Sequence, residues 1–146
     1  MAELSGWEIV RLTWQIQHRL FSAAAEGLQD LGIHPKALAI LAILEALPHP
    51  GDIARSIGSP PPTVSNILKS LEAAGWVDRA SDQTDRRRIA YRRTPAGDRI
   101  LALGIERVDR AAAESLQQLS PDELGRLHEL LIRAAGPGPV VDGPSG

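Results

Sequence analysis

Arginine side chains are concentrated in one short segment of this sequence. The run SDQTDRRRIAYRRT, from Ser81 to Thr94, carries five arginines, although the whole chain has a formal net charge of -2. Between Arg79 and Arg99 seven arginines stand against three aspartates, a local charge of +4, so the rest of the chain totals -6. Guanidinium groups bind phosphates through planar, charge-assisted hydrogen bonds. The segment therefore predicts a local anionic partner, and the alternative is a solvated run of surface charge.

Length and composition are those of one globular domain. With 146 residues, 43% of them hydrophobic, the chain is long enough to bury a core. No apolar run approaches the roughly 20 residues that span a bilayer, and the N-terminus lacks the basic-then-apolar order of a signal peptide. We therefore expect a cytoplasmic protein. The absence of cysteine excludes disulfides, thiolate metal sites and thiol-based redox sensing in this chain.

Sequence motifs of catalysis are missing. The chain has no glycine-rich phosphate loop, no nucleophile elbow and no HExxH pair of metal ligands. Its four histidines show no close ligand spacing, which argues against a zinc site; they are His18, His34, His49 and His128. The sequence thus predicts a protein that is not an enzyme and that needs no cofactor and no metal.

Hydrophobic periodicity predicts a mainly helical fold with a small β wing of two to three strands. The expected elements are helices over 4–31, 35–47, 52–57 and 61–74, strands over 76–79 and 87–94, and two further helices that begin at Pro95 and Pro121. Thr94 is expected to cap the fifth helix, and Ser120 with Glu123 forms a capping box for the sixth. The second helix is apolar almost all round and is therefore expected to be buried.

From Asp52 to Thr94 the predicted order is helix, turn, helix and two-stranded hairpin, which is a DNA-binding architecture. The second of these helices has one apolar stripe, formed by Val64, Ile67, Leu68 and Leu71. Its opposite face is small and polar; the residues are Pro62, Ser65, Asn66, Lys69 and Ala73, flanked by Thr63 and Ser70. In a major groove, Asn can bond adenine, Ser and Thr reach base edges or phosphate, and Lys neutralises phosphate. The alternative is an ordinary solvated helix face.

The run from Ile53 to Gly97 resembles the winged helix-turn-helix of MarR-type (multiple antibiotic resistance regulator) transcription factors. The matching features are Ile53-Ala54, Thr63-Val64-Ser65, Leu71-Glu72 to Gly75 before Val77-Asp78-Arg79, the wing motif Asp82, Asp85, Arg86, Arg87, and Thr94 to Gly97. The resemblance extends more weakly over the flanking helices. It implies a DNA-binding transcriptional regulator, more often a repressor than an activator. The other function class that we keep open is a winged helix that contacts only proteins.

In this family the wing places an arginine in the minor groove, and an aspartate two positions earlier braces the wing. Carried onto this sequence, these residues are Arg87 and Asp85, with Arg86 and Arg88 as neighbouring candidates for DNA contact. An arginine at a hairpin tip suits the negative potential of a narrow, A·T-rich minor groove. Because a lone carboxylate would repel phosphate, Asp82 is also expected to act as a brace inside the wing.

The entrance to the second helix of the motif departs from the family pattern. Prolines occupy positions 60–62, where residues with backbone N–H groups would commonly face a phosphate. Either this anchor is lost, or the side chains of Thr63 and Ser65 replace it.

The resemblance also implies a homodimer on a pseudo-palindromic DNA operator, held together by the terminal helices. Two apolar stripes fit this arrangement; they are Leu101, Ile105, Val108 and Ala112, and Leu124, Leu127, Leu130, Leu131 and Ile132. Packing onto the protein's own core is the alternative, because periodicity does not separate burial between chains from burial within one. The predicted division is a dimerisation helix (1–34), a winged domain (35–97), dimerisation helices (98–135) and a flexible Gly- and Pro-rich tail (136–146).

A small-molecule effector, aromatic or anionic, is the last implication of the resemblance. Its site is expected between the dimerisation helices and the winged domain, where this chain offers Arg11, Trp14, His18 and His34. Trp14 and His18 lie one helical turn apart, and an arginine nearby suits a carboxylate. The alternative is that the tryptophan and histidines simply pack or cap helices.

Overall fold

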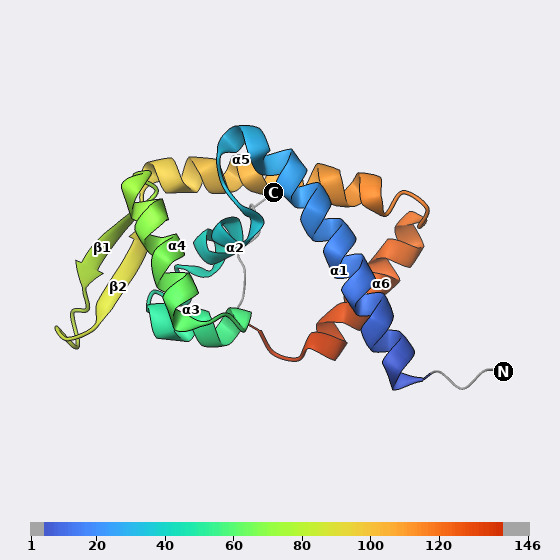
Figure 1. Cartoon of the computed structure of the whole chain (residues 1–146), viewed down its shortest axis with the longest axis horizontal. Coiled ribbons are helices and arrows are strands. Elements are labelled where there is room, and N and C mark those ends of the chain that lie inside the picture. The colour runs from blue at the N-terminus through green and yellow to red at the C-terminus, as the bar shows by residue number, and fades with distance from the viewer. Residues whose placement is uncertain (1–4, 139–146) are drawn as a thin grey trace.

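A computed structural model describes residues 5–138 of the chain as a set of helices with one antiparallel hairpin (Figure 1). The elements are α1 (Gly6–Leu28), η1 (Gln29–Leu31), α2 (Pro35–Ile43), α3 (Pro50–Ile57), α4 (Pro61–Ala73), β1 (Val77–Ser81), β2 (Ile89–Arg93), α5 (Pro95–Ser115) and α6 (Pro121–Ala135). The predicted mainly α fold with a small β wing is confirmed. None of the helices described is long and apolar enough to cross a membrane. Most of the predicted flexible tail lies outside the described residues.

Several element boundaries differ from the predicted ones for local reasons. The first helix tightens into the 3-10 turn η1 and ends where Gly32 adopts a φ of 67°. The second helix ends at Ile43 rather than at residue 47. The third helix begins at Pro50 rather than at residue 52, because proline is well accommodated in the first turn of a helix. The caps at Thr94 and at Ser120 with Glu123 are confirmed.

The wing is a two-stranded hairpin that is tied to the segment before α3. Strands β1 and β2 pair in a register that runs from Val77 opposite Arg93 to Ser81 opposite Ile89. A third strand is not formed in the part of the chain described; instead, the N–H of Tyr91 donates one hydrogen bond of 2.8 Å to the carbonyl of Pro48. This bond fixes the hairpin beside the entrance to α3.

The hydrophobic core lies between the helix-turn-helix and the long helices α1 and α5. Its fully buried side chains are Leu28, Ile40, Leu41, Leu44, Ile53, Val64, Leu68 and Val77. The expected burial of α2 is thus confirmed. Leu101 is also buried, and Ile105 and Val108 pack against the same core. The first of the two stripes predicted for dimerisation therefore packs largely within its own chain.

Two glycines allow α5 to approach its neighbours closely. A Cβ atom on Gly97 would lie 2.0 Å from the carbonyl oxygen of Trp76, and one on Gly104 would lie 2.4 Å from a methyl carbon of Leu38. Neither separation is compatible with van der Waals contact. The first turn of α5 is therefore seated directly on the backbone that leads into β1.

Arg93 joins three elements below the wing. Its guanidinium lies 2.6 Å from the Glu45 carboxylate after α2 and 2.7 Å from Asp98 of α5, and donates a 2.9 Å bond to the carbonyl of Leu41. Only 11% of its side chain is exposed. This arginine belongs to the charged run that is expected to face an anionic partner, but its charge is paired inside the protein.

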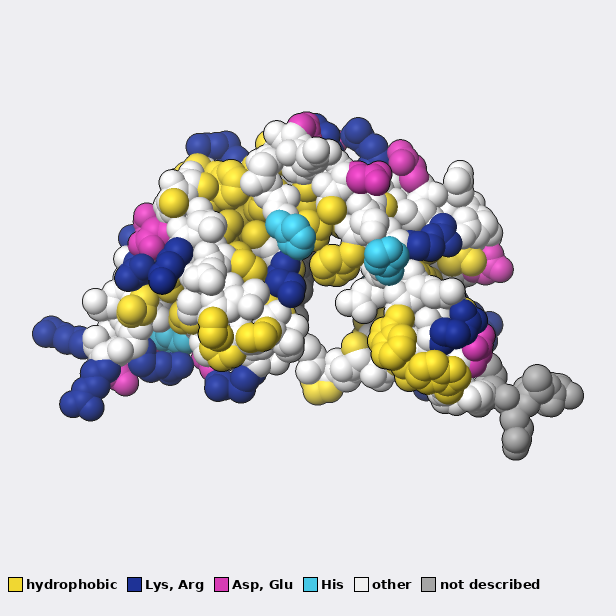
Figure 2. Space-filling view, in the orientation of Figure 1, with side chains coloured by type: hydrophobic (Ala, Val, Ile, Leu, Met, Phe, Trp, Pro, Cys, Tyr) yellow, Lys and Arg dark blue, Asp and Glu magenta, His cyan; other side chains and the backbone are white. Residues whose placement is uncertain are grey.

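Helices α1 and α6 lie at the end of the molecule opposite the wing, and α5 spans the distance between the two ends (Figure 1). Helix α6 contains no buried residue. Leu130, Leu131 and Ile132 are each at least half exposed, and so are Trp7 and Trp14 of α1. Hydrophobic side chains are visible over the N-terminal part of α1 in Figure 2. A single chain thus leaves much apolar surface of these two helices uncovered.

Candidate nucleic-acid interface

Helix α4 begins without free backbone donors. Pro60 is its N-cap residue, and Pro61 and Pro62 fill the first two helical positions, so neither has an N–H group. The next N–H group, that of Thr63, donates to the carbonyl of Pro60 at 3.0 Å. No N–H of this first turn remains for a phosphate, so any phosphate contact here depends on side chains.

The face of α4 opposite the core is accessible. Val64, Leu68 and Leu71 are buried. On the other side Pro62, Asn66, Lys69, Ser70 and Ala73 are exposed, while Thr63 and Ser65 are half-buried at the flanks. The hydroxyl of Ser70 donates to the carbonyl of Asn66 at 3.1 Å, which leaves its lone pairs as acceptors. Asn66 and Lys69 are therefore the longest side chains that this face presents to a partner.

Both wing aspartates make hydrogen bonds inside the wing loop. Asp82 Oδ1 accepts from the N–H of Thr84 at 2.8 Å and from its hydroxyl at 2.7 Å. These bonds, the hydroxyl first, lower the pKa of the Asp82 carboxyl. Asp85 Oδ1 accepts from the N–H of Arg87 at 3.0 Å. The loop is closed by a bond of 3.1 Å from the N–H of Asp82 to the carbonyl of Arg88.

The arginines of the charged segment have different partners. Arg79 binds Glu72 of α4 at 3.0 Å and lies 5.7 Å from the centre of the Tyr91 ring; these neighbours, Glu72 first, raise the pKa of Arg79. Arg88 lies 3.4 Å from Asp52 of α3. Within residues 5–138, Arg86 and Arg87 have no ion pair and are exposed. Positive side chains project from the wing end of the molecule (Figure 2).

Two residues that connect the wing to α3 were not found from the sequence. His49 Nε2 lies 3.0 Å from Asp82 Oδ2, and Asp52 accepts from both Arg88 and Arg55. His49 and Asp82 are 33 positions apart, so no local pattern could have indicated the contact. The base of the wing loop is thus held to α3 at two points.

Three of the four residues proposed for an effector site lie on α1, and the fourth, His34, lies at the start of α2. Arg11 donates to Glu8 at 2.8 Å, which raises the pKa of Arg11 and lowers that of Glu8. Trp14 packs edge-on against Trp7, with ring centres 5.8 Å apart. His34 caps α2 by accepting from the N–H of Lys36. His18 lines a hollow between α1 and the turn after α5, at a distance from His34, which borders α4.

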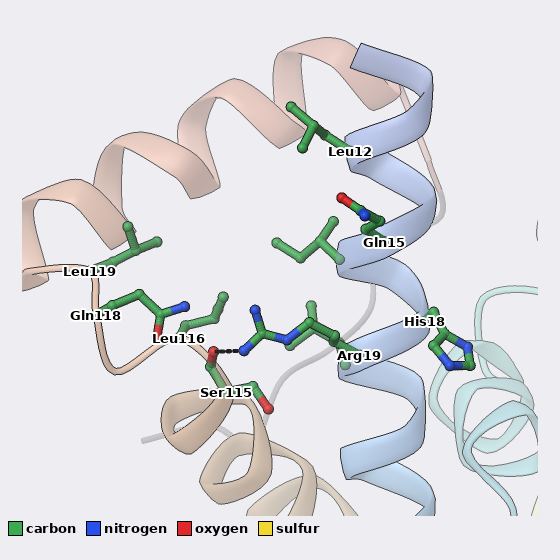
Figure 3. A pocket seen from close by; sticks show the side chains of 10 residues that line it. Leu12, Gln15, His18, Arg19, Ser115, Leu116, Gln118 and Leu119 are labelled. Carbon is green, nitrogen blue, oxygen red and sulfur yellow. Dashed lines mark hydrogen bonds between the residues drawn. The ribbon is translucent and has the colours of Figure 1, made fainter. Parts of the chain in front are cut away.

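The hollow at α1 contains an arginine, Arg19, that no sequence motif indicated. Figure 3 shows Arg19 extending from α1 toward the turn that follows α5, whereas His18 leaves the helix on its other side. The guanidinium of Arg19 donates to the carbonyl of Ser115 at 3.1 Å. A second hollow, of about 510 Å³, lies between α1, α2 and α5; it is mostly apolar and includes Asp109. Within residues 5–138 no group of three or more His, Cys, Asp or Glu side chains is placed to hold a metal ion.

The chain is similar to known proteins in sequence and in fold. A model of the MarR family matches residues 31–88, which include α2, α3, α4, β1 and the wing loop (82–88). A MarR-family transcriptional regulator from Rhodococcus sp. RHA1 has a TM-score of 0.83 at 20% identity, over 95% of this chain and 100% of that one. No curated protein sequence matches the chain.

Two further similar structures contain a bound molecule. A cysteine-to-serine mutant of E. coli MarR in complex with operator DNA has a TM-score of 0.76 at 21% identity, over 89% of this chain and 94% of that one. CouR from Rhodococcus jostii RHA1, bound to p-coumaroyl-CoA, has a TM-score of 0.75 at 21% identity, over 90% and 94%. At these identities the likeness concerns the fold.

Proposed function

We propose that this chain is a member of the MarR family of winged helix-turn-helix transcriptional regulators and that it acts as a homodimeric repressor, which a small molecule releases from a pseudo-palindromic operator; the family match over residues 31–88 and the fold support this. The observation that carries the DNA-binding part is the pair of exposed wing-tip arginines, which have no ion pair within residues 5–138 and lie at the same end of the molecule as α4. We expect the protein to act in the cytoplasm, because a transcriptional regulator must reach the DNA.

For DNA reading we assign separate roles to the helix and the wing. Asn66 reads base edges in the major groove, and Lys69 neutralises a phosphate. Thr63, Ser65, Ser70 and Pro62 complete the contact surface of the helix. Arg87 enters the minor groove with Arg86 beside it, while Asp82 and Asp85 brace the loop. Arg88 contributes less to DNA than its neighbours do, since it also pairs with Asp52.

For dimerisation we propose that α1 and α6 cover their exposed apolar side chains against a second copy. Support comes from the lack of any buried residue in α6 and from the exposure of Leu130, Leu131 and Ile132. A monomer rarely exposes a large contiguous apolar patch without a binding role. We keep the division into segments 1–34, 35–97, 98–135 and 136–146, with the amendment that Leu101 belongs to the core of the winged domain.

The experiment that tests this function combines sedimentation with footprinting. The purified protein is expected to sediment as a dimer at micromolar concentration and to protect two half-sites, about 34 to 36 Å apart, on a genomic fragment obtained by affinity selection. Leu131→Glu is expected to give a monomer, because it places a charge in the apolar contact. Leu103→Glu, an exposed leucine outside both predicted stripes, is the matched control. If the wild-type protein is a stable monomer and gives no discrete footprint, the result would favour the alternative function, a winged helix that contacts only proteins.

Two substitutions on α4 separate base reading from phosphate binding. Asn66→Ala is expected to relax the preference for particular base pairs at a cost of about 1 to 3 kcal/mol in binding free energy. Lys69→Ala is expected to weaken all duplexes evenly and to lower the salt dependence by about one phosphate contact. Titrations on the selected and a scrambled duplex at several salt concentrations measure both effects. Equal losses on the two duplexes for both variants would contradict the assignment.

We propose that the effector is an aromatic or anionic small molecule that binds at α1. In the proposed site Arg11 leaves Glu8 to bind a carboxylate, near Trp14 and His18. Salicylate-like acids are therefore expected to quench tryptophan fluorescence and to release DNA over the same concentration range, because release requires different affinities for two states. Arg11→Ala should weaken both responses, and Arg19→Ala serves as the comparison for the neighbouring hollow. DNA binding that is unchanged by millimolar aromatic acids would exclude this class of effector.

A further inference from the structure

Both ring nitrogens of His49 face hydrogen-bond acceptors of the wing. Nε2 lies 3.0 Å from Asp82 Oδ2, and Nδ1 lies 3.1 Å from the carbonyl oxygen of Ile89. The side chains of His49 and Asp82 are only 14% and 16% exposed. A carboxylate and a carbonyl accept hydrogen bonds and do not donate them, so both contacts are hydrogen bonds only when each ring nitrogen carries a proton. That form is the imidazolium cation.

His49 lies between the start of α3 and the wing, so protonation of its ring affects contacts that hold the wing. The residue is the N-cap of α3, and its neighbour Pro48 accepts the N–H of Tyr91 from β2. Asp82 donates the closing bond of the wing loop to Arg88, and Ile89 is the first residue of β2 after it. The histidine therefore contacts both ends of the loop that carries Arg86 and Arg87.

The other charged groups around His49 do not remove the preference for the cation. Asp52 on α3 is shared between Arg88 and Arg55, so its charge is already paired. The N-terminal end of α3 disfavours a positive charge, since its dipole has the same sign. The Asp82 carboxylate lies at hydrogen-bond distance from the ring and favours a positive charge there. Its charge-assisted hydrogen bond is stronger than the effect of the helix dipole.

The Asp82 carboxyl is ionised at neutral pH. Its pKa is lowered, first by the Thr84 hydroxyl and then by the Thr84 N–H, with a smaller effect of His49. Stability that depends on a lowered carboxyl pKa is present above the ordinary value of about 4 and is lost only as the pH falls through the lower, folded value. The carboxylate of Asp82 is therefore a charged acceptor for His49 Nε2 at neutral pH.

We propose that His49 is a positioning residue which, when protonated, clamps the base of the wing loop to α3 and so makes DNA binding by this protein dependent on pH. The inference rests on the proposed DNA-binding function. Deprotonation leaves one N–H for two acceptors, so either Asp82 or the Ile89 carbonyl then faces a ring lone pair. One of the two contacts that His49 makes at the base of the wing loop is then lost, and Arg86 and Arg87 are held less firmly in the binding orientation.

The first test needs no DNA. Long-range ¹H–¹⁵N spectra of the wild-type protein are expected to show both ring nitrogens of His49 protonated near pH 5, and ¹⁵N relaxation should show loop amides such as Thr84 becoming more mobile as the ring loses a proton. His49→Gln has no titrating group and should show no pH-dependent change in loop mobility. A neutral His49 ring over the whole range, or loop mobility that does not follow its titration, would overturn the proposal.

The second test measures binding of a fluorescent mixed-sequence duplex at fixed ionic strength. Wild-type affinity is expected to fall about tenfold from about pH 5 to about pH 8, since a charge-assisted hydrogen bond is lost. His49→Gln and Asp82→Asn should both bind weakly with little pH dependence, which keeps the test valid if one variant folds poorly. His128→Gln removes an exposed histidine from α6, away from the wing, and should retain the wild-type slope. An unchanged slope in His49→Gln contradicts the clamp, whereas a wild-type protein that binds no duplex contradicts the DNA-binding function and leaves the first test decisive.

Discussion

Replacing Gly97 with alanine is expected to lower the free energy of unfolding by about 3 kcal/mol, at the upper end of the usual cost of overpacking. The new Cβ would lie 2.0 Å from the carbonyl oxygen of Trp76 and 3.0 Å from its carbon. These atoms belong to the backbone, so relief requires α5 to move away from the start of β1. Such a shift also strains the bond of 3.1 Å from the N–H of Thr94 to the same carbonyl. Urea unfolding at one fixed protein concentration measures the loss.

Gly51→Ala is the matched control for Gly97→Ala. Gly51 also lies in the first turn of a helix shortly after a proline, but a Cβ there would meet nothing within 4 Å. Alanine is the better helix former, so this variant is expected to be as stable as the wild type or more stable by up to about 1 kcal/mol. If Gly97→Ala and Gly51→Ala have the same free energy of unfolding, that result would contradict a close contact between α5 and the backbone of Trp76.

Replacing Arg87 with alanine is expected to cause the largest loss of DNA affinity among single substitutions in the wing. A charge-assisted hydrogen bond contributes at least about 1.5 kcal/mol, and two wings act in the proposed dimer, so the expected loss is about 3 kcal/mol, or roughly a hundredfold. The effect should be greatest on operators with A·T-rich flanks, where the narrow minor groove is most negative, and smaller on G·C-rich flanks. Anisotropy titrations on duplexes that differ only in their flanks measure this difference.

The matched control for this prediction is Arg99→Ala, which removes the same charge from α5. Arg99 is exposed and has no ion pair among residues 5–138, so its loss should change affinity little and without regard to the flanks. Equal effects of the two variants would mean that only the net charge matters.

Asp85→Ala separates the order of the wing loop from its charge. Because its carboxylate accepts the N–H of Arg87 at 3.0 Å, its removal is expected to loosen the tip and weaken DNA binding, although it also removes a negative charge. Simple charge counting gives the opposite sign. Tighter DNA binding by Asp85→Ala would therefore show that this aspartate acts only as a repulsive charge.

Features that depend on neighbouring residues were predictable from the sequence. Thr94 caps α5 through the N–H of Gly97, and the capping box of Ser120 and Glu123 begins α6, because these contacts join residues three positions apart. The apolar stripe of α4 and the burial of α2 likewise follow from periodicity within one helix. The wing motif lies in one continuous run, so its likeness to the MarR family was visible in the sequence.

Only the tertiary structure decided which charged residues are available for DNA. Arg93 and Arg87 look alike in the sequence, yet Arg93 is held by the Leu41 carbonyl, 52 positions away, whereas Arg87 is unpaired within residues 5–138. The contacts of His49 with Asp82 and of Asp52 with Arg88 also join distant segments. A local pattern specifies neighbours within a turn or a strand pair, while the partner of a long polar side chain depends on which segments the core brings together. The same physical reason explains why Leu101 belongs to the protein's own core, although its spacing fits a dimer interface equally well.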